Sequence, residues 1–274
     1  MSNSTELADP TKSTDPTGPT VAISTLRRSH DRLTALLQGL DADGIRQESY
    51  DAGWPIAQVA SHLGSQAEVF GLVLEAGLTG NDVPDMPAVH QIWARWDGST
   101  PEEQVKASLE ANEAFLAGVE SLSPEDQERF TAEMFGTEVD LNQLVAMKLS
   151  EHAIHTWDVA TALDPAATVS DDAVALLLDD VPALAAEVGT PTTEPTTIAV
   201  TVTDPERRYL VVTGPAVSVA AIEDNADDGT DASLRLPAEA FLRLVYGRLD
   251  PTHVPAGVIE GAELETLRTV FRGL

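Results

Sequence analysis

The spacing of apolar residues predicts a helical first half of the chain. From about residue 21, apolar side chains recur every three or four positions, which is typical of an amphipathic helix; its inward positions are Ile23, Leu26, His30, Leu33, Leu37 and Leu40. The glycines and aspartates of residues 39–44 should end it. A second helix is expected from Gly53-Trp54-Pro55, because proline suits a first helical turn. Its inward positions are Ile56, Val59, His62, Gln66, Phe70 and Val73.

Two further helices complete the predicted bundle. Residues 77–98 contain two prolines and two tryptophans and are interpreted as a long loop with one short turn. Thr100-Pro-Glu-Glu103 has the pattern of a capping box with proline at the first helical position, so a third helix should begin there. A fourth helix is expected from about Asp140 to Leu163, with inward positions Leu144, Met147, Glu151, Ile154, His155 and Asp158. Four helices of this length favour a four-helix bundle.

After Asp164-Pro165 the pattern changes to that of a mixed domain. Residues 171–188 still follow a helical period. Alternating, β-branched residues then predict strands, and two apolar periods predict helices at 237–246 and 263–271; the strands are expected at 196–203, 209–213, 216–222, 234–236 and 258–260. We therefore predict a two-domain α+β protein. Its parts are a disordered tail (1–20), a helical bundle (21–165) and a smaller α+β domain (170–274).

Composition narrows the classes of function. The 274 residues include 45 acidic and 16 basic side chains, giving a formal net charge of −29. Such a charge repels phosphate backbones and anionic membranes, so no nucleic-acid or membrane partner is expected. No apolar run approaches the length of about 18 residues that a membrane span needs. The chain has no cysteine, which excludes disulfides and a catalytic thiol of its own. No secretory signal is visible, so a cytoplasmic location is expected.

The segment Ser150–Asp158 carries the most informative chemistry. Glu151 and His155 are four residues apart, so they share one helical face, and both continue the inward stripe of the fourth helix. A carboxylate facing a bundle core is unfavourable unless it is paired, protonated or bound to a metal. With the inward His62 of the second helix they would form a His₂Glu set. That set suits Zn²⁺ with one coordination position left open, while Ni²⁺, Fe²⁺ and Mn²⁺ also accept such ligands.

Each of these residues also has a purely structural interpretation. The Glu151–His155 pair could be a hydrogen bond within the helix, and His30 could be a satisfied core histidine. His152 is rotated off this face and is expected to point to solvent or to a helix edge. Asp158 could orient a ligating histidine, or it could be a cap or a surface acid. Trp157 is expected to serve packing.

Two motifs in these helices resemble the mycothiol-dependent maleylpyruvate isomerase family. Trp54-Pro-Ile-Ala-Gln-Val59-Ala-Ser-His62-Leu63 is similar to the family's W-x-x-x-x-V-x-x-H-L segment, and Glu151-x-x-x-His155-x-x-Asp158 resembles its second metal segment. The resemblance implies a DinB-like four-helix bundle. It also implies a divalent metal, typically zinc, bound by His62, Glu151 and His155. Pro55 departs from the family, which often has a serine or threonine cap there.

The C-terminal half extends the resemblance. Val245-Tyr-Gly247-Arg248 and Val258-Ile-Glu-Gly261 are similar to the family's second domain, an α+β module that resembles sterol-carrier domains. This implies a catalytic role for Arg248, which would grip a substrate carboxylate through two hydrogen bonds. The alternative for Arg248 is a cation that interacts with the last carbonyls of its helix. The acidic loop at 223–231 is a departure from the family.

The activity implied by the resemblance is the cis–trans isomerisation of maleylpyruvate. A thiolate adds to the conjugated double bond, the resulting single bond rotates, and the thiol leaves. Mycothiol would supply the sulfur, which is consistent with the lack of cysteine, and the metal would lower the pKa of its thiol. His30 shares the apolar stripe of the first helix, so it is expected to approach the same cavity without being a primary metal ligand. Its expected role is a hydrogen bond to a bound water, to the thiol or to a neighbouring side chain.

Two other classes of function stay open at this stage. One is a metal-dependent hydrolase that uses metal-bound water at the same site. The other is a non-catalytic protein that binds a metal or a small ligand. The expected partners are a small anionic substrate and a low-molecular-weight thiol, and the expected assembly is a monomer or a homodimer.

Overall fold

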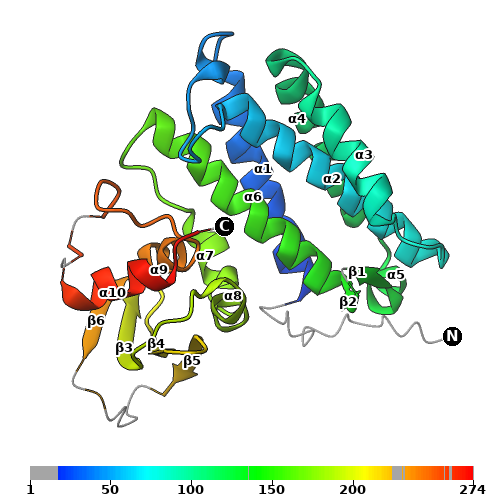
Figure 1. Ribbon diagram of the computed structural model, residues 1–274. Helices are drawn as coiled ribbons and strands as arrows, with labels where there is room; N and C mark the ends of the chain where they lie inside the picture. The colour runs from blue at the N-terminus through cyan, green and yellow to red at the C-terminus, as the bar shows by residue number, and fades with distance from the viewer. Residues whose placement is uncertain are drawn as a thin grey trace, which may run out of the picture.

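The structure is a computed structural model that places the chain in two regions, one helical and one built on a sheet (Figure 1). It describes residues 18–134, 136–223, 230, 232–255, 257–258 and 261–273. Most of the predicted tail, residues 1–17, lies outside the described residues. Residues 19 and 20, also predicted to be tail, are instead the first residues of α1, because Pro19 fits its first turn.

Four long helices form the N-terminal bundle, as predicted: α1 (Pro19–Gln38), α2 (Ile56–Thr79), α4 (Pro101–Glu120) and α6 (Leu141–Leu163). Helices α1 and α2 each pack against both α4 and α6. The predicted capping box starts α4, since the Thr100 side chain accepts from the Glu103 amide and the Glu103 side chain accepts from the Thr100 amide. The bundle therefore holds α2 and α6, which carry the candidate metal ligands, against each other.

The segment predicted as a long loop, 77–98, is mostly helical. Helix α2 continues to Thr79, and α3 (Met86–Asp97) follows it. The Asp85 carboxylate caps α3 by accepting from the Ala88 amide, and Pro87 lies in the first turn, where proline is compatible with a helix. The side chains of Val89, Ile92 and Trp96 are buried. The prolines thus mark the start of a helix here and do not prevent one.

A short connection between α4 and α6 was not predicted. It consists of α5 (Pro124–Arg129) and the antiparallel hairpin β1 (Thr131–Met134) and β2 (Thr137–Asp140). A 3₁₀ turn, η1 (Gly44–Arg46), lies between α1 and α2. Asp140 ends β2 and caps α6, because its carboxylate accepts from the Gln143 amide while the Gln143 side chain accepts from the Asp140 amide. This reciprocal cap fixes where α6 begins.

The second region is the α+β domain that the strand pattern predicted. Its helices are α7 (Asp171–Leu177), α8 (Val181–Val188), α9 (Ala238–Val245) and α10 (Ala262–Val270), and its strands are β3 (Thr196–Thr203), β4 (Arg207–Thr213), β5 (Ser218–Ile222) and β6 (Ser233–Pro237). The sheet order is β5-β4-β3-β6, with β6 parallel to β3 and the other pairs antiparallel. Of the strand predicted at 258–260, Val258 is not in a strand and the other two residues lie outside the described residues.

Helix α6 lies at the junction of the two regions. Helix α7 contacts both α1 and α6, and the Arg243 guanidinium of α9 lies 4.6 Å from the ring centroid of Trp157 on α6. The Tyr50 hydroxyl donates to Asp250 of the second region at 2.8 Å. As a result α6 is covered on several sides, and both Trp157 and Asp158 are fully buried. No helix among the described residues has the length and apolar character needed to cross a membrane.

Candidate metal centre

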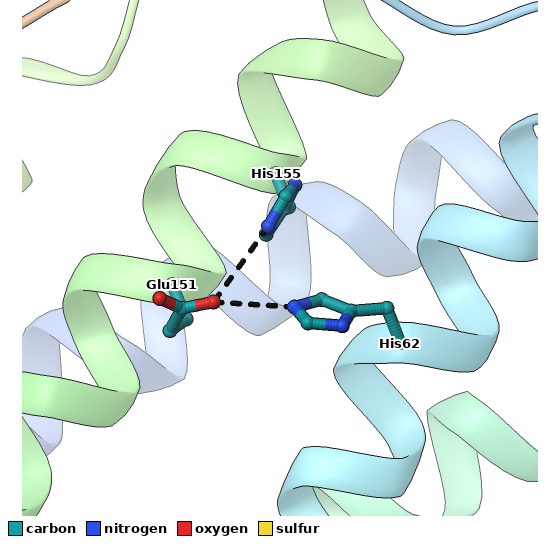
Figure 2. Close-up of side chains that lie close together, drawn as sticks. All are labelled: His62, Glu151 and His155. Carbon is teal, nitrogen blue, oxygen red and sulfur yellow. Dashed lines mark hydrogen bonds and ion pairs between the residues drawn. The ribbon is translucent and has the colours of Figure 1, made fainter. Parts of the chain in front are cut away.

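The three side chains predicted as metal ligands lie close together between α2 and α6. His62 Nε2 is 3.2 Å from Glu151 Oε2, and His155 Nε2 is 3.6 Å from the same oxygen. Their donor atoms all lie within 4.8 Å of one another. Figure 2 shows the two imidazole rings pointing toward the Glu151 carboxylate from different helices. The structure therefore brings this set together, as the helical phases predicted.

The spacing of these donors fits a small divalent ion. Ligand atoms about 2.1 Å from a tetrahedral zinc are about 3.4 Å apart, and the two distances to Glu151 Oε2 lie on either side of that value. The His62 and Glu151 side chains are 28% and 35% exposed, so the set has an open side toward solvent. Two imidazoles and one carboxylate, with one coordination position left open, are the ligand arrangement typical of a catalytic zinc site.

A buried carboxylate orients His155. Its Nδ1–H donates to Asp158 Oδ2 at 2.7 Å, and Asp51 Oδ2 lies 3.4 Å from the same nitrogen. Burial by itself lowers the pKa of His155, but these two carboxylates outweigh burial and raise it to about 9. Nε2 is therefore the nitrogen that faces Glu151 and a metal. A carboxylate behind a ligating histidine fixes the ring and increases its basicity.

The other two candidate ligands have the protonation states that metal binding needs. Burial lowers the pKa of His62, so its imidazole is neutral near pH 7. Burial alone would raise the pKa of Glu151, but hydrogen bonds from His62 and Gln66 and the charge of His155 lower it to about 2. Gln66 Nε2 donates to Glu151 Oε2 at 2.7 Å. The carboxylate is thus ionised and held in place by an amide from α2.

Arg248 reaches this network from the second domain. Its Nε and Nη2 donate to the two oxygens of Asp158 at 2.8 and 2.9 Å, Nη2 also donates to Asp51 at 3.2 Å, and Nη1 donates to the Tyr246 carbonyl. Burial lowers its pKa, but Asp158 and Asp51 raise it overall. The planar fork predicted to grip a substrate carboxylate is bound here to Asp158. Direct contact between Arg248 and a substrate stays a prediction.

Gly247 makes the position of Arg248 possible. Its backbone has φ +71°, in the left-handed region, and a Cβ atom at this residue would lie 2.0 Å from the amide nitrogen of Gly273. The C-terminal segment therefore crosses directly over Gly247. The glycine before Arg248 permits this close approach between two segments of the second domain, and the contacts of Arg248 with Asp158 and Asp51 join its loop to the bundle.

His30 lies in a different cluster from the one predicted. Its Nε2 is 3.5 Å from Glu113 of α4, and its ring is 6.0 Å from that of His152, centroid to centroid. Neither contact involves His62, Glu151 or His155, so this geometry does not support a place for His30 beside the metal set. His152 is also not at a solvent-facing edge: it is fully buried, and its Nδ1 lies 2.9 Å from the Ser29 hydroxyl. Helix α6 has one polar face toward α2 and another toward α1.

Three side chains that shape the site were not predicted from the sequence to have a role there. Asp51 lies in the loop before α2, where no periodicity points to it. Gln66 was assigned to the inner face of α2, and its spacing of four residues from His62 was the signal for a shared role. The third, Lys148, is buried one turn before Glu151, and its Nζ donates to the Leu63 carbonyl at 2.9 Å.

A polar cavity of about 480 Å³ opens at the boundary between the two domains, next to this network. It is lined by the loop at 48–52, by the end of α6, by the loop at 247–253 and by residues 272–273. Asp51 and Arg248 both line the cavity and contact Asp158 or His155. The cavity therefore borders the hydrogen-bond network behind His155, and its lining residues do not include His62, Glu151 or His155.

Comparisons with known proteins concern the N-terminal domain and the fold. Residues 26–160 match the family model described as mycothiol maleylpyruvate isomerase N-terminal domain. Two crystal structures are similar to the chain, one of the mycothiol-dependent maleylpyruvate isomerase and one of a histidine-to-alanine mutant of it. Each is 14% identical, with a TM-score of 0.64 over 84% of this chain and 89% of the other. This likeness shows a shared fold that extends beyond the bundle. No curated protein matches the sequence.

Proposed function

Since this chain belongs, through its N-terminal domain, to the mycothiol maleylpyruvate isomerase family, we propose that it is a divalent-metal-dependent enzyme that uses mycothiol. Its reaction would be the isomerisation of a small anionic substrate or the transfer of a thiol to it. Zinc is the proposed metal, and a cytoplasmic location in an actinobacterial cell is part of the same proposal. The observation that carries it is the convergence of His62, Glu151 and His155 on one partly exposed point.

Each residue of the set would have a definite task. His62 and His155 would offer Nε2 lone pairs, and Glu151 would offer an ionised oxygen that Gln66 holds in place. A bound divalent metal would lower the pKa of the cosubstrate thiol, so that a thiolate is available near pH 7. Asp158 would keep the His155 ring in one orientation, and Arg248 would hold the Asp158 carboxylate in place. We infer that Arg248 is a positioning residue in this geometry.

The aromatic surroundings would limit access of water to the reacting atoms. The Trp54 ring lies 5.3 Å from His62 and stacks on His155 at 6.3 Å, centroid to centroid. Beside Glu151 in the sequence, the Ser150 hydroxyl is hydrogen-bonded to the hydroxyl of Tyr246 from the second domain. Partial exclusion of water strengthens the electrostatic interactions of a thiolate with a metal.

The test begins with the metal content of the purified chain and of His155→Ala. A matched control is His90→Ala, which changes an exposed histidine of α3. We expect one metal per chain in the wild type and in the control, and loss of the metal in His155→Ala. Turnover of maleylpyruvate should then require both the metal and mycothiol. Equal metal content in all three proteins would contradict the site, and metal-dependent turnover that needs no thiol would favour a hydrolase using metal-bound water.

A further inference from the structure

A buried arginine of the second domain holds the loop that reaches the bundle. Arg243 of α9 is 2% exposed, and its Nη1 donates to the carbonyls of Arg248 and His253, at 3.1 and 2.9 Å. Both carbonyls belong to the loop at 247–253. We propose that Arg243 is a positioning residue for the metal centre, which it supports through this loop. This inference rests on the proposed function, because it names a residue on which the metal affinity of that site depends.

The other edges of the Arg243 guanidinium are also fixed. Its Nε and Nη2 donate to the two carboxylate oxygens of Glu239, one turn earlier in α9, and its Cζ lies 4.6 Å from the ring centroid of Trp157 on α6. Glu239 in turn accepts from the Val169 amide at 3.2 Å. The planar group therefore binds a carboxylate on one edge and two loop carbonyls on another, which sets the place of the loop relative to α9 and α6.

The stability of the second domain alone does not explain an ion pair in this place. Arg243 and Glu239 are both buried, and moving two charges out of water is unfavourable. Replacing such a pair by apolar side chains of similar volume is often neutral or stabilising. The need for a guanidinium here therefore points to what it binds, the two partly buried carbonyls of the loop, which would be left without these donors.

A second arginine holds the middle of the same loop. Arg268 of α10 donates through Nε to the Leu249 carbonyl at 2.6 Å, and the Leu249 side chain is buried. Arg243 and Arg268 thus bind three carbonyls of one loop from two helices. We expect Arg268 to affect the metal centre in the same direction as Arg243, but less, because it makes one of these three bonds.

The loop connects Arg243 to the candidate ligand His155 through direct contacts. Arg248 donates through Nε and Nη2 to the two oxygens of Asp158 at 2.8 and 2.9 Å, and Asp158 Oδ2 accepts from His155 Nδ1 at 2.7 Å. A displacement of the loop by about 1 Å would stretch these bonds beyond the usual range of about 2.7–3.2 Å. The orientation of the His155 ring therefore depends on the place that Arg243 gives to the loop.

The direct test is the zinc affinity of the full chain, measured by competition with a chelator. Arg243→Lys keeps the charge beside Glu239, but an ammonium cannot bind that carboxylate and both carbonyls with the geometry of a planar fork. We expect it to weaken zinc binding about tenfold, as a group behind a ligating histidine does, and Arg268→Lys to weaken it by a smaller factor. Arg235→Lys is the matched control, because Arg235 on β6 is 64% exposed, and it should bind zinc as the wild type does.

A second substitution distinguishes positioning from a general loss of stability. If Arg243 acts through Asp158, Arg243→Lys should weaken zinc binding much less in the Asp158→Asn chain than in the wild type, because the connection to His155 is already weakened there. A merely structural role would lower the affinity by the same factor in both chains. Urea unfolding of the zinc-free chains measures the stability of each variant separately.

The outcomes separate this inference from the proposed function. Turnover that depends on mycothiol, together with wild-type zinc affinity in both lysine variants, would overturn the inference and leave the function standing. Weaker zinc binding that depends on Asp158, without any mycothiol-dependent turnover, would support the inference and contradict the proposed function. An equal loss in both chains would overturn the inference, and a wild type that binds no zinc would overturn both. If Arg243→Lys does not fold, Arg268→Lys decides alone.

Discussion

Lys148 is a buried cation whose removal should stabilise the metal-free protein. Its residue is 1% exposed, and Nζ donates to the Leu63 carbonyl at 2.9 Å. The Phe70 ring centroid lies 6.0 Å from Nζ. Burial lowers the pKa of Lys148 from 10.5 to about 7, and the charge of Glu151 offsets this only in part. Folding therefore removes a proton from this side chain, or buries its charge, over a wide range of pH.

The size and sign of the effect follow from the two pKa values. Between pH 7 and 10.5 the unfolded chain binds a proton at Lys148 that the folded chain lacks, so the free energy of unfolding rises with pH. At 1.36 kcal/mol per pKa unit, the penalty is about 4 kcal/mol at pH 7 and about 1 kcal/mol at pH 10. Lys148→Met removes this penalty and also loses the bond to Leu63, which is worth about 1 kcal/mol. The variant should therefore gain about 3 kcal/mol at pH 7 and almost nothing at pH 10.

Urea unfolding in the presence of a chelator, at several values of pH from 7 to 10, measures this directly. Lys106→Met is the matched control, because Lys106 on α4 is 79% exposed and its substitution should change stability little at any pH. The diagnostic result is a stability difference between Lys148→Met and the wild type that shrinks as pH rises. A difference that stays constant over this range, or that grows, would refute the assignment of a depressed pKa to Lys148.

Three further predictions concern the metal and the domain boundary. Asp158→Asn should lower metal affinity about ten- to hundredfold while the ligands stay in place, as measured by competition with a chelator, and unchanged affinity would remove Asp158 from its role behind His155. Because the pKa of His155 is raised to about 9, binding of a metal should release one proton at pH 7 and almost none at pH 10. Calorimetry at pH 7 in buffers of different ionisation heat measures this release, and equal apparent enthalpies in all buffers would contradict it. Gly247→Ala should lower the free energy of unfolding by more than about 2 kcal/mol, because it adds a steric clash to a left-handed backbone. Gly257→Ala is the control and should lower it by about 1 kcal/mol, because Gly257 also has a positive φ, +93°, but has no atom within 4 Å of the added Cβ. Equal losses in these two variants would show that the close approach at Gly247 is unimportant.

The sequence predicted those parts of the fold that follow from local periodicity and capping. The long helices and the four-stranded sheet are such parts, and so is the shared face of Glu151 and His155. Helix α3 was missed because proline was read only as a helix breaker, and the hairpin at 131–140 was missed because strands of four residues give too little alternation to detect. The error at His152 has another cause: the pattern assumes one inward face, whereas α6 is covered on several sides.

The support of His155 could not be predicted from the sequence. Asp51 comes from a loop about a hundred residues earlier in the chain, and Arg248 from another domain. Their meeting at Asp158 depends on how the two domains pack, which local patterns do not encode. From the sequence, Asp158 could orient a ligating histidine, cap a helix or be a surface acid. Only the structure shows that its two oxygens accept from the His155 imidazole and from the Arg248 guanidinium.

The contact from Arg248 through Asp158 to His155 would couple two equilibria, the proposed binding of a metal in the bundle and the docking of the second domain onto it. A metal on His155 would favour the orientation that Asp158 and Arg248 maintain, and the docked second domain favours the same orientation. Such coupling is reciprocal: whatever free energy the docked domain adds to metal affinity, the metal adds to the stability of docking. A chelator would then loosen a domain that contributes no metal ligand, and damage to the loop at 247–253 would appear first as a weaker hold on the metal.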